Sequence, residues 1–326
     1  MSTSGASLFE AYLNQYDSQA WNAVLVSLLP SIHEVDKTAT QIWFAFYPLA
    51  LAQALDRAED PEQLAKKLQL SGKYRLKDQI ATSHEFLYGH RYWPEVRQAV
   101  IELASSERVP SSLELAAQIR EIAARAAGQA KVDASLVTGI ASVAFMTLQQ
   151  VGFEAFKASP SARGRISNRS PEQVLKARAR DDDQGLFGFL KGVKKDWTVT
   201  FDEHDPTARF KLINSQELTT AAACDKRDYR SRDPRCIEGG GPIPIECRSA
   251  ACGTCWVGVL GGAEKLSSVT PREARKIKEF GYIDTIDPKP LIRLACVAQA
   301  TGAVSIVIPP WNGVFGKYLK KSANNQ

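Results

Sequence analysis

The sequence has no cysteine before residue 224, and all six of its cysteines lie in the last third of the 326-residue chain. A secreted scaffold held by disulfides is excluded, because such domains spread cysteines through a short exported chain. No apolar run reaches the roughly 18 uninterrupted residues of a membrane-spanning helix. Residues 1–10 lack the basic and apolar regions of a signal peptide. We therefore expect no transmembrane helix, no leader and a cytoplasmic location.

The sequence also lacks the motifs of several enzyme classes. It contains no Gly-x-Gly-x-x-Gly, no Walker loop and no Gly-x-Ser-x-Gly elbow. Their absence gives no support to a fused flavin or nicotinamide domain, or to a hydrolase. Solenoid-length repeats are absent too. The apolar content of 44% and the charged content of 24% exclude a fully disordered or collagen-like chain.

Charge and hydrophobic periodicity divide the chain into three regions. Residues 1–156 carry 13 Lys and Arg against 17 Asp and Glu, residues 157–195 carry 10 against 4, and residues 196–326 carry 18 against 15. The first region is rich in Ala and Leu at helical spacing and has no clear strand, which predicts an all-helical domain of unknown role with about six or seven helices. The expected helices lie near residues 7–29, 38–58, 78–89, 94–105 and 132–156, and two more are expected to open at residues 60–62 and 110–114, the second running to Gly128.

Residues 157–195 are predicted to form a basic linker, because residues 157–170 are rich in Ser, Arg and Gly. A short charged helix is expected after Pro171. From Asp196 the hydrophobic period changes to the alternation of strands, and capping signals at Thr270–Glu273 predict a further helix. The fold class is therefore α+β, with an all-helical N-terminal domain and a mixed C-terminal domain over residues 196–326.

Four cysteines carry the strongest chemical signal. Cys247, Cys252 and Cys255 follow one another as Cys-x4-Cys-x2-Cys, and Cys296 comes after 40 further residues. Four thiolates, two on each iron, are what a [2Fe-2S] cluster requires, and three close cysteines at this spacing with a distant fourth are typical of one class of such clusters. Structural zinc is the alternative, but it usually uses two Cys-x2-Cys pairs and this sequence has one. The pattern therefore favours the cluster.

The loop Cys247–Cys255 and the segment Arg293–Cys296 resemble the plant-type [2Fe-2S] ferredoxins of the β-grasp fold, and the likeness covers about residues 196–310. The resemblance implies a β-grasp domain, one-electron transfer, and iron ligation by Cys247, Cys252, Cys255 and Cys296. Three features depart from the family: the longer gap before Cys296, an insertion at residues 225–246, and a basic rather than acidic domain. The first two affect loop geometry and the third affects the choice of partner.

These features lead to three functional hypotheses. The first is one-electron transfer to or from a redox protein, with the helical domain used for docking. The alternative is an iron-sulfur subunit of a larger, membrane-associated oxidoreductase complex, and the third is a redox sensor. We expect an electron carrier or electron-transfer subunit rather than a stand-alone enzyme, and no catalytic residue is assigned.

Several other features leave alternatives open. A basic stretch could steer a partner with an acidic docking surface or could be a solvated loop, and no recognised nucleic-acid motif accompanies it. It comprises Lys226, Arg227, Arg230, Arg232 and Arg235. The segments 185–195 and 313–321 combine apolar and basic residues, so they could contact a membrane surface peripherally, pack on their own domain, or dock on a membrane-protein partner.

Two residue pairs are also ambiguous. Cys224 and Cys236 flank the insertion, where a disulfide, a second metal site or a redox thiol are alternatives to unpaired structural cysteines. His84 and His90 could belong to a haem or di-metal site, but they form no Glu-x-x-His pair. We expect them to be core or surface histidines.

Overall fold

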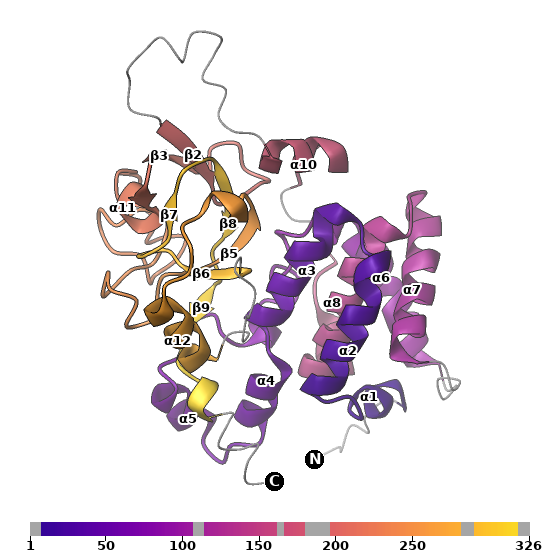
Figure 1. Cartoon of the computed structure of the whole chain (residues 1–326). Helices are drawn as coiled ribbons and strands as arrows, with labels where there is room; N and C mark the ends of the chain where they lie inside the picture. Colours follow the sequence, from indigo (N-terminus) through magenta and orange to yellow (C-terminus); the bar gives the residue numbers. More distant parts are fainter. Residues whose placement is uncertain (1–7, 107–113, 162–165, 180–195, 282–289, 319–326) are drawn as a thin grey trace. The chain divides into compact units, whose positions relative to one another are not determined.

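The computed structural model describes residues 8–106, 114–161, 166–179, 196–281 and 290–318. The chain divides into two compact units, and each is built from two stretches of sequence. Unit 1 contains Met1–Ala58 and Arg75–Ile166, and unit 2 contains Glu59–Tyr74 and Ser167–Gln326. Figure 1 shows helices alone in unit 1 and a sheet with short helices in unit 2, as expected for an α+β chain.

The regular elements of unit 1 are all helices among its described residues. Its α-helices are α1 (Leu8–Leu13), α2 (Ser18–Leu28), α3 (Glu34–Phe46), α4 (Leu49–Asp56), α6 (Trp93–Ser105), α7 (Leu115–Ala130), α8 (Ser135–Val151) and α9 (Phe153–Ala158). Short 3-10 turns add η1 (Leu29–Ser31), η2 (Leu76–Asp78) and η3 (Tyr88–Tyr92).

Helix α8 forms the centre of unit 1. Every residue from Val137 to Gln149 is buried, and the helix packs against α3, α6 and α7 (Figure 1). A helix that is apolar on all sides requires such a surrounded position. Gly139 permits the close approach of α3, because a Cβ there would lie 2.6 Å from Thr40 Oγ1. None of the described helices has the length and apolar character needed to cross a membrane.

Local signals divide the long helices expected from the sequence. Asp17 caps α2, and its carboxylate accepts a 2.8 Å hydrogen bond from the Ala20 N–H. Pro48 separates α3 from α4, and Gly152, with a φ of 81°, separates α8 from α9.

The helix expected at residues 78–89 is absent, and turns occupy most of this segment. The buried Asp36 carboxylate accepts hydrogen bonds from the N–H groups of Tyr88 and Gly89 at 2.7 and 2.6 Å. These long-range contacts replace the local hydrogen bonds that a helix would need, so the helical prediction for this segment was wrong.

Unit 2 is built around a mixed five-stranded sheet in the order β3-β2-β8-β5-β6 (Figure 1). The strands are β2 (Asp196–Thr200), β3 (Arg209–Ile213), β5 (Trp256–Gly261), β6 (Ile292–Leu294) and β8 (Val304–Val307). Strands β2 and β8 pair in parallel, and the other neighbours pair antiparallel. The hairpin of β2 and β3 was expected from the alternation of its residues, and Trp197 pairs with Leu212 in it.

Smaller elements complete unit 2. They are α5 (Pro61–Lys67), β1 (Ser71–Gly72), α10 (Pro171–Ala179), β4 (Gln216–Glu217), α11 (Leu218–Ala222), η4 (Ala263–Lys265), α12 (Pro271–Phe280), β7 (Gln299–Ala300) and β9 (Trp311–Asn312). Strand β4 pairs with β7, and β1 pairs with β9.

Residues 59–74 lie in unit 2, whereas the helical domain predicted from the sequence spans residues 1–156. Strand β1 pairs with β9 in the register Ser71 to Asn312, and the N–H of Val314 donates a 2.7 Å hydrogen bond to the Leu68 carbonyl. Trp311 is fully buried at this junction. The segment therefore supplies part of the core of unit 2 from a distant place in the sequence.

Two further segments belong to unit 2. Helix α10, expected in the linker, belongs to unit 2 and contributes the buried Arg178. Phe315 of the C-terminal segment is also fully buried, with its ring centroid 5.7 Å from that of Trp311, so it packs on its own unit. The segment 185–195 lies outside the described residues.

Candidate metal centre

The loop from Cys247 to Cys255 has a tightly turned backbone. Arg248, Ala250 and Gly253 have φ values of 49°, 53° and 78°. This left-handed region is uncommon for residues with a side chain, because the Cβ approaches the following carbonyl oxygen. The loop therefore holds a conformation that a relaxed chain would rarely adopt.

The turned backbone directs N–H groups at cysteine sulfur atoms. The N–H of Ala250 donates to Cys296 Sγ at 3.3 Å. The N–H groups of Ala251 and Cys252 donate to Cys247 Sγ at 3.2 and 3.4 Å. Such donors stabilise negative charge on sulfur, which both thiolate ligation and reduction of a cluster require.

All four cysteines of the motif come together, in two neighbouring pairs. Cys247 hydrogen-bonds with Cys252, and Cys255 with Cys296. The pairs also interact electrostatically with each other, through Cys252 and Cys255 and through Cys247 and Cys296. No three or more His, Cys, Asp or Glu side chains of the described residues are grouped as a site for a single metal ion.

In the outer pair, the loop makes ionisation of Cys247 easier, whereas burial raises the pKa of Cys252. Burial opposes ionisation of Cys247, but hydrogen bonds from the N–H groups of Ser249, Ala251 and Cys252 outweigh it and lower its pKa to about 6. In the inner pair, the hydrogen bond between the two thiols lowers the pKa of Cys296 and raises that of Cys255.

The two pairs differ in exposure. Cys255 and Cys296 are 2% and 6% exposed, whereas Cys247 and Cys252 are half-buried. One side of the site is therefore shielded by the domain and the other lies near the surface, where an electron could enter or leave. Thr254 supports the loop, because its hydroxyl donates a 3.0 Å hydrogen bond to the Glu246 carboxylate.

Helix α12 contacts both parts of the sequence that supply the cysteines. At its end, a Cβ on Gly253 would lie 2.9 Å from the Phe280 ring. Near its start, Glu273 accepts a 2.8 Å hydrogen bond from Arg293 and a 3.0 Å hydrogen bond from the Leu294 N–H. The helix thus ties the cysteine loop to the strand that leads to Cys296.

The pairing of Glu273 with Arg293 was not expected from the sequence. The sequence predicts Glu273 as the second half of a capping box, and the Thr270 hydroxyl does accept a 3.1 Å hydrogen bond from the Glu273 N–H. The glutamate side chain, however, pairs with Arg293. An arginine among apolar residues 291–295 was the available signal, because a buried charge requires a partner.

The comparisons with known proteins support the chemistry of the loop. Residues 219–301 match the family model described as a 2Fe-2S iron-sulfur cluster binding domain. Unit 2 contains a [2Fe-2S] ferredoxin domain. The matched range includes all four cysteines of the motif, and the cofactor of the ferredoxin domain is a [2Fe-2S] cluster. Neither the curated proteins nor the solved structures gave a significant match.

The residues of the ferredoxin domain fit such a cluster. Four thiols in two pairs match two irons with two thiolates each, and N–H groups already point at Cys247 and Cys296. When bound, a [2Fe-2S] cluster accepts and returns one electron at a time. The ferredoxin domain therefore has an electron-transfer role, and such a role implies a redox partner.

The basic insertion is largely neutralised by its own aspartates. The sequence Asp-x-Arg occurs three times, and each arginine donates from its backbone N–H and its guanidinium to the aspartate two residues before it. The pairs are Asp225 with Arg227, Asp228 with Arg230, and Asp233 with Arg235. Arg232 pairs with Asp202 at 3.2 Å. The solvated-loop interpretation fits the exposed Arg227, Arg230 and Arg232 better than a free basic patch, whereas the Arg235 side chain is buried.

The two remaining residue pairs have no partner of the kind a metal site requires among the described residues. Cys224 is exposed and Cys236 is buried, and both are free thiols. Burial raises the pKa of Cys236 to about 11, so it stays protonated. His84 and His90 are buried, with their Nδ1 atoms 2.9 Å apart. They are core histidines, as expected.

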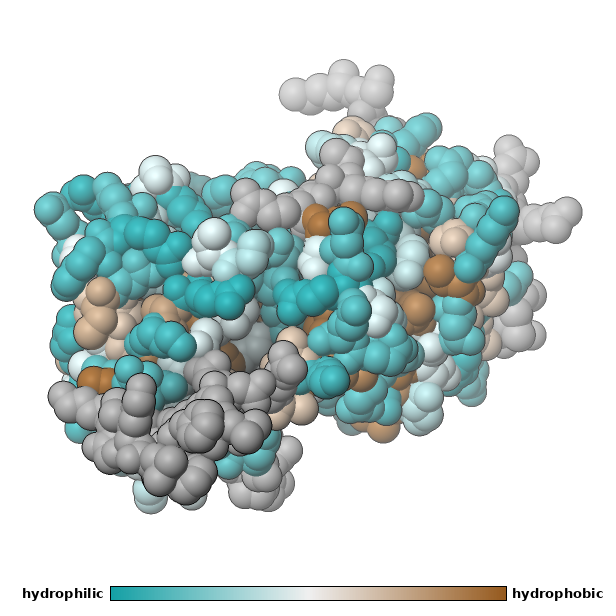
Figure 2. All heavy atoms as spheres, turned by 90° about the horizontal axis from the view of Figure 1, so that it is seen from above, coloured by the Kyte–Doolittle hydropathy of each residue, from teal (hydrophilic) through white to brown (hydrophobic). Residues whose placement is uncertain are grey.

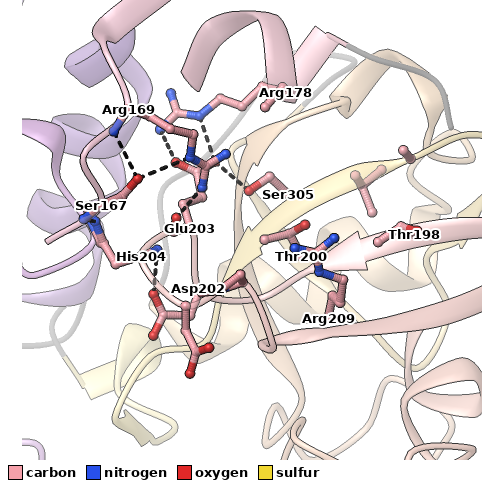
Figure 3. Close-up of a pocket in the computed structure, with 15 residues that line it drawn as sticks. Ser167, Arg169, Arg178, Thr198, Thr200, Asp202, Glu203, His204, Arg209 and Ser305 are labelled. Atoms are coloured by element: carbon pink, nitrogen blue, oxygen red, sulfur yellow. Dashed lines mark hydrogen bonds and ion pairs between the residues drawn. The ribbon is translucent and has the colours of Figure 1, made fainter. Parts of the chain in front are cut away.

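Unit 2 also contains a cavity of about 650 Å³ beside β2 and β8 (Figure 3). Both oxygens of Glu203 accept 2.8 Å hydrogen bonds from Arg178, and Ser305 donates to the same carboxylate. Burial opposes ionisation of Glu203, but Arg178 outweighs it and lowers the pKa of that carboxyl. Arg178 contacts Gly261, at the end of β5 remote from Cys255, so the cavity is separate from the cysteine loop.

Proposed function

We propose that Cys247, Cys252, Cys255 and Cys296 bind the [2Fe-2S] cluster and that the protein transfers single electrons to or from a redox protein. The observation that carries this proposal is the double pairing of the thiols with N–H groups directed at Cys247 and Cys296. We also propose a β-grasp fold for the domain. Its support is the sheet order β3-β2-β8-β5-β6 with one parallel pair, β2 and β8.

In this proposal the chain passes an electron to or from a partner and carries out no reaction on a substrate. The half-buried pair Cys247 and Cys252 faces the surface, and the buried pair Cys255 and Cys296 faces the domain interior. Thiolates from all four cysteines, together with the sulfides of the cluster, would complete the coordination of both irons and would leave no open position for a substrate. The reaction is therefore outer-sphere transfer to a docked partner.

The helical unit is proposed to serve in docking, and the oxidoreductase subunit remains the alternative. Among its described residues, unit 1 exposes the large apolar side chains of Leu8 and Val26. An assembly surface usually needs a continuous apolar patch of several hundred Å², which two such side chains do not form. On the face in Figure 2, hydrophobic residues form separate small areas among hydrophilic ones. This distribution favours the electron carrier.

Purification of the whole protein without oxygen tests the proposal. We expect iron and acid-labile sulfide in equal amounts, a visible spectrum that bleaches on one-electron reduction, and an EPR signal in the reduced form. Replacement of Cys296 by Ser should lower the iron content severalfold, because one of four ligands is changed. Cys224→Ser is the matched control, since this exposed thiol lies outside the motif. Full iron content in Cys296→Ser, or zinc in place of iron, would contradict the proposal.

A further inference from the structure

Helix α12 lies directly beside the proposed cluster site. Phe280 at its end packs on Gly253 of the cysteine loop, and Glu273 in its first turn bonds the N–H of Leu294, two residues before Cys296. The helix therefore runs along the site over most of its length. Its outer face lies within about one helix diameter, roughly 10 Å, of the residues that hold the cysteines.

The outer face of α12 carries exposed positive charge. Arg272 and Arg275 are exposed, and neither forms an ion pair with another described residue. Arg248, exposed in the cysteine loop, also has no ion-pair partner in the described part of the chain. These three residues are named here the α12 patch.

Acidic groups near the α12 patch offset only part of its charge. Glu279 forms a 2.6 Å ion pair with Lys276 of the same helix, and Lys317 and Arg275 lie close enough to lower the pKa of that carboxyl further. Glu246, next to Cys247, accepts a hydrogen bond from Thr254. Among the described residues, an excess of cations therefore remains beside the cysteines, in contrast to the insertion, where each of the four arginines has a carboxylate partner.

We propose that the α12 patch is the docking surface for an acidic region of the redox partner. The inference rests on the proposed electron-transfer function and names the chemistry of its partner. Opposite charges on two docking faces raise the rate of encounter, and salt weakens this effect. At physiological ionic strength a charge acts over about 8 Å, so only cations close to the cluster can guide a partner into electron-transfer distance.

Oxidation of the reduced holoprotein by small complexes of opposite charge tests this surface. Each turnover moves one electron from the reduced cluster to ferricyanide, which becomes ferrocyanide, or to hexaamminecobalt(III), which becomes cobalt(II). For the wild type we expect the ferricyanide rate to fall as salt is added and the cobalt rate to rise. An acidic flavodoxin serves as the protein-sized acceptor, and its rate should show the same salt dependence as the ferricyanide rate.

The test variant is Arg272→Glu with Arg275→Glu, and the matched control is Arg230→Glu with Arg232→Glu, which changes the net charge equally. At low salt the test variant should lose roughly five- to tenfold in the ferricyanide and flavodoxin rates and gain in the cobalt rate. The control should change each rate less than twofold. Equal rates for the test variant and the wild type, or a larger loss in the control, would overturn the proposal.

The spectrum of the cluster distinguishes a failure of the docking proposal from a failure of the proposed electron-transfer function. If a variant has a normal spectrum and unchanged rates, the docking surface is wrong and the electron-transfer function stands. If the wild type itself carries no reducible cluster, the proposed function fails before docking is reached. Arg248 is left unchanged in these variants, because its left-handed backbone is part of the cysteine loop.

Discussion

At the scale of single residues, Gly253 connects the cysteine loop to its support. Its φ of 78° is a conformation that glycine adopts without strain. It also lies so close to the Phe280 ring that no side chain fits between them. Glycine is therefore required at this position for two reasons, the backbone conformation and the packing, and their contributions to stability can be measured separately.

Replacement of Gly253 by Ala should destabilise the protein and lower its iron content. The left-handed conformation costs about 1–2 kcal/mol for a residue with a Cβ, and overpacking against Phe280 adds about 1–3 kcal/mol. Gly239→Ala is the matched control, because Gly239 has a φ of 69° and no neighbour within 4 Å of a new Cβ. The free energy of unfolding in urea and the bound iron give the comparison. Equal losses in the two variants would show that the contact with Phe280 contributes nothing.

His84 gives a prediction about pH. Burial, followed by the nearby His90, lowers the pKa of His84 well below its usual value of 6.5, and its Nε2 atom has no hydrogen-bond partner. In the unfolded chain the same ring gains a proton near pH 6.5, so acid favours unfolding. Stability should be constant above this pH and should fall below it by up to about 1.4 kcal/mol per pH unit.

Unfolding of His84→Asn between pH 7.5 and pH 5 measures this contribution. Asparagine keeps a polar atom near the place of Nδ1, so the variant removes the titration with little change in shape. Its stability should depend less on pH than that of the wild type. His33→Asn is the control, because His33 is a half-buried helix cap and asparagine caps well. A slope unchanged in His84→Asn would refute the assignment.

At the scale of elements, one buried ion pair joins α12 to β6. Arg293 and Glu273 are 3% and 0% exposed, with Nε–Oε1 and Nη2–Oε2 distances of 2.8 and 3.1 Å. Arg293 also donates to the Ser267 carbonyl at 2.9 Å. Because Cys296 follows Arg293 by three residues, this pair fixes the direction in which the chain reaches the cysteine site.

Replacement of Glu273 by Leu should leave the Arg293 charge buried without its partner and lower the free energy of unfolding by roughly 3–5 kcal/mol. The double variant with Arg293→Met should recover most of the loss, because an apolar pair of similar volume can replace a buried ion pair. Urea unfolding of the two single variants and the double variant measures the coupling. Additive losses would show that the two side chains act independently.

At the scale of the whole molecule, features set by neighbouring residues can be predicted from the sequence, whereas pairings between segments far apart in the chain cannot. The hairpin of β2 and β3 and the capped start of α12 were predicted because each signal lies within a few neighbouring residues. The four cysteines were assigned from residue type and spacing alone. The sequence of residues 59–74 predicts only a capped helix. No neighbouring residue indicates that β1 pairs with β9, about 240 residues later in the chain. The helical prediction around His84 was wrong for the same reason, because the segment bonds to Asp36, which lies on the distant helix α3.

The membership of residues 59–74 in unit 2 leads to a prediction about fragments. Residues 167–326 alone lack β1 and α5, so β9 loses its partner strand and Trp311 loses part of its cover. We expect this fragment to melt at a lower temperature and to retain less iron than the whole chain. A fusion of residues 59–74 to its start, through a flexible linker of about 20 residues, should restore both.

The same fusion carrying Gly72→Val should not, because Gly72 has a φ of 82° and a Cβ there would lie 2.4 Å from the Pro310 carbonyl oxygen. If the bare fragment matches the fusion in melting temperature and iron, this segment is not part of the ferredoxin unit's core.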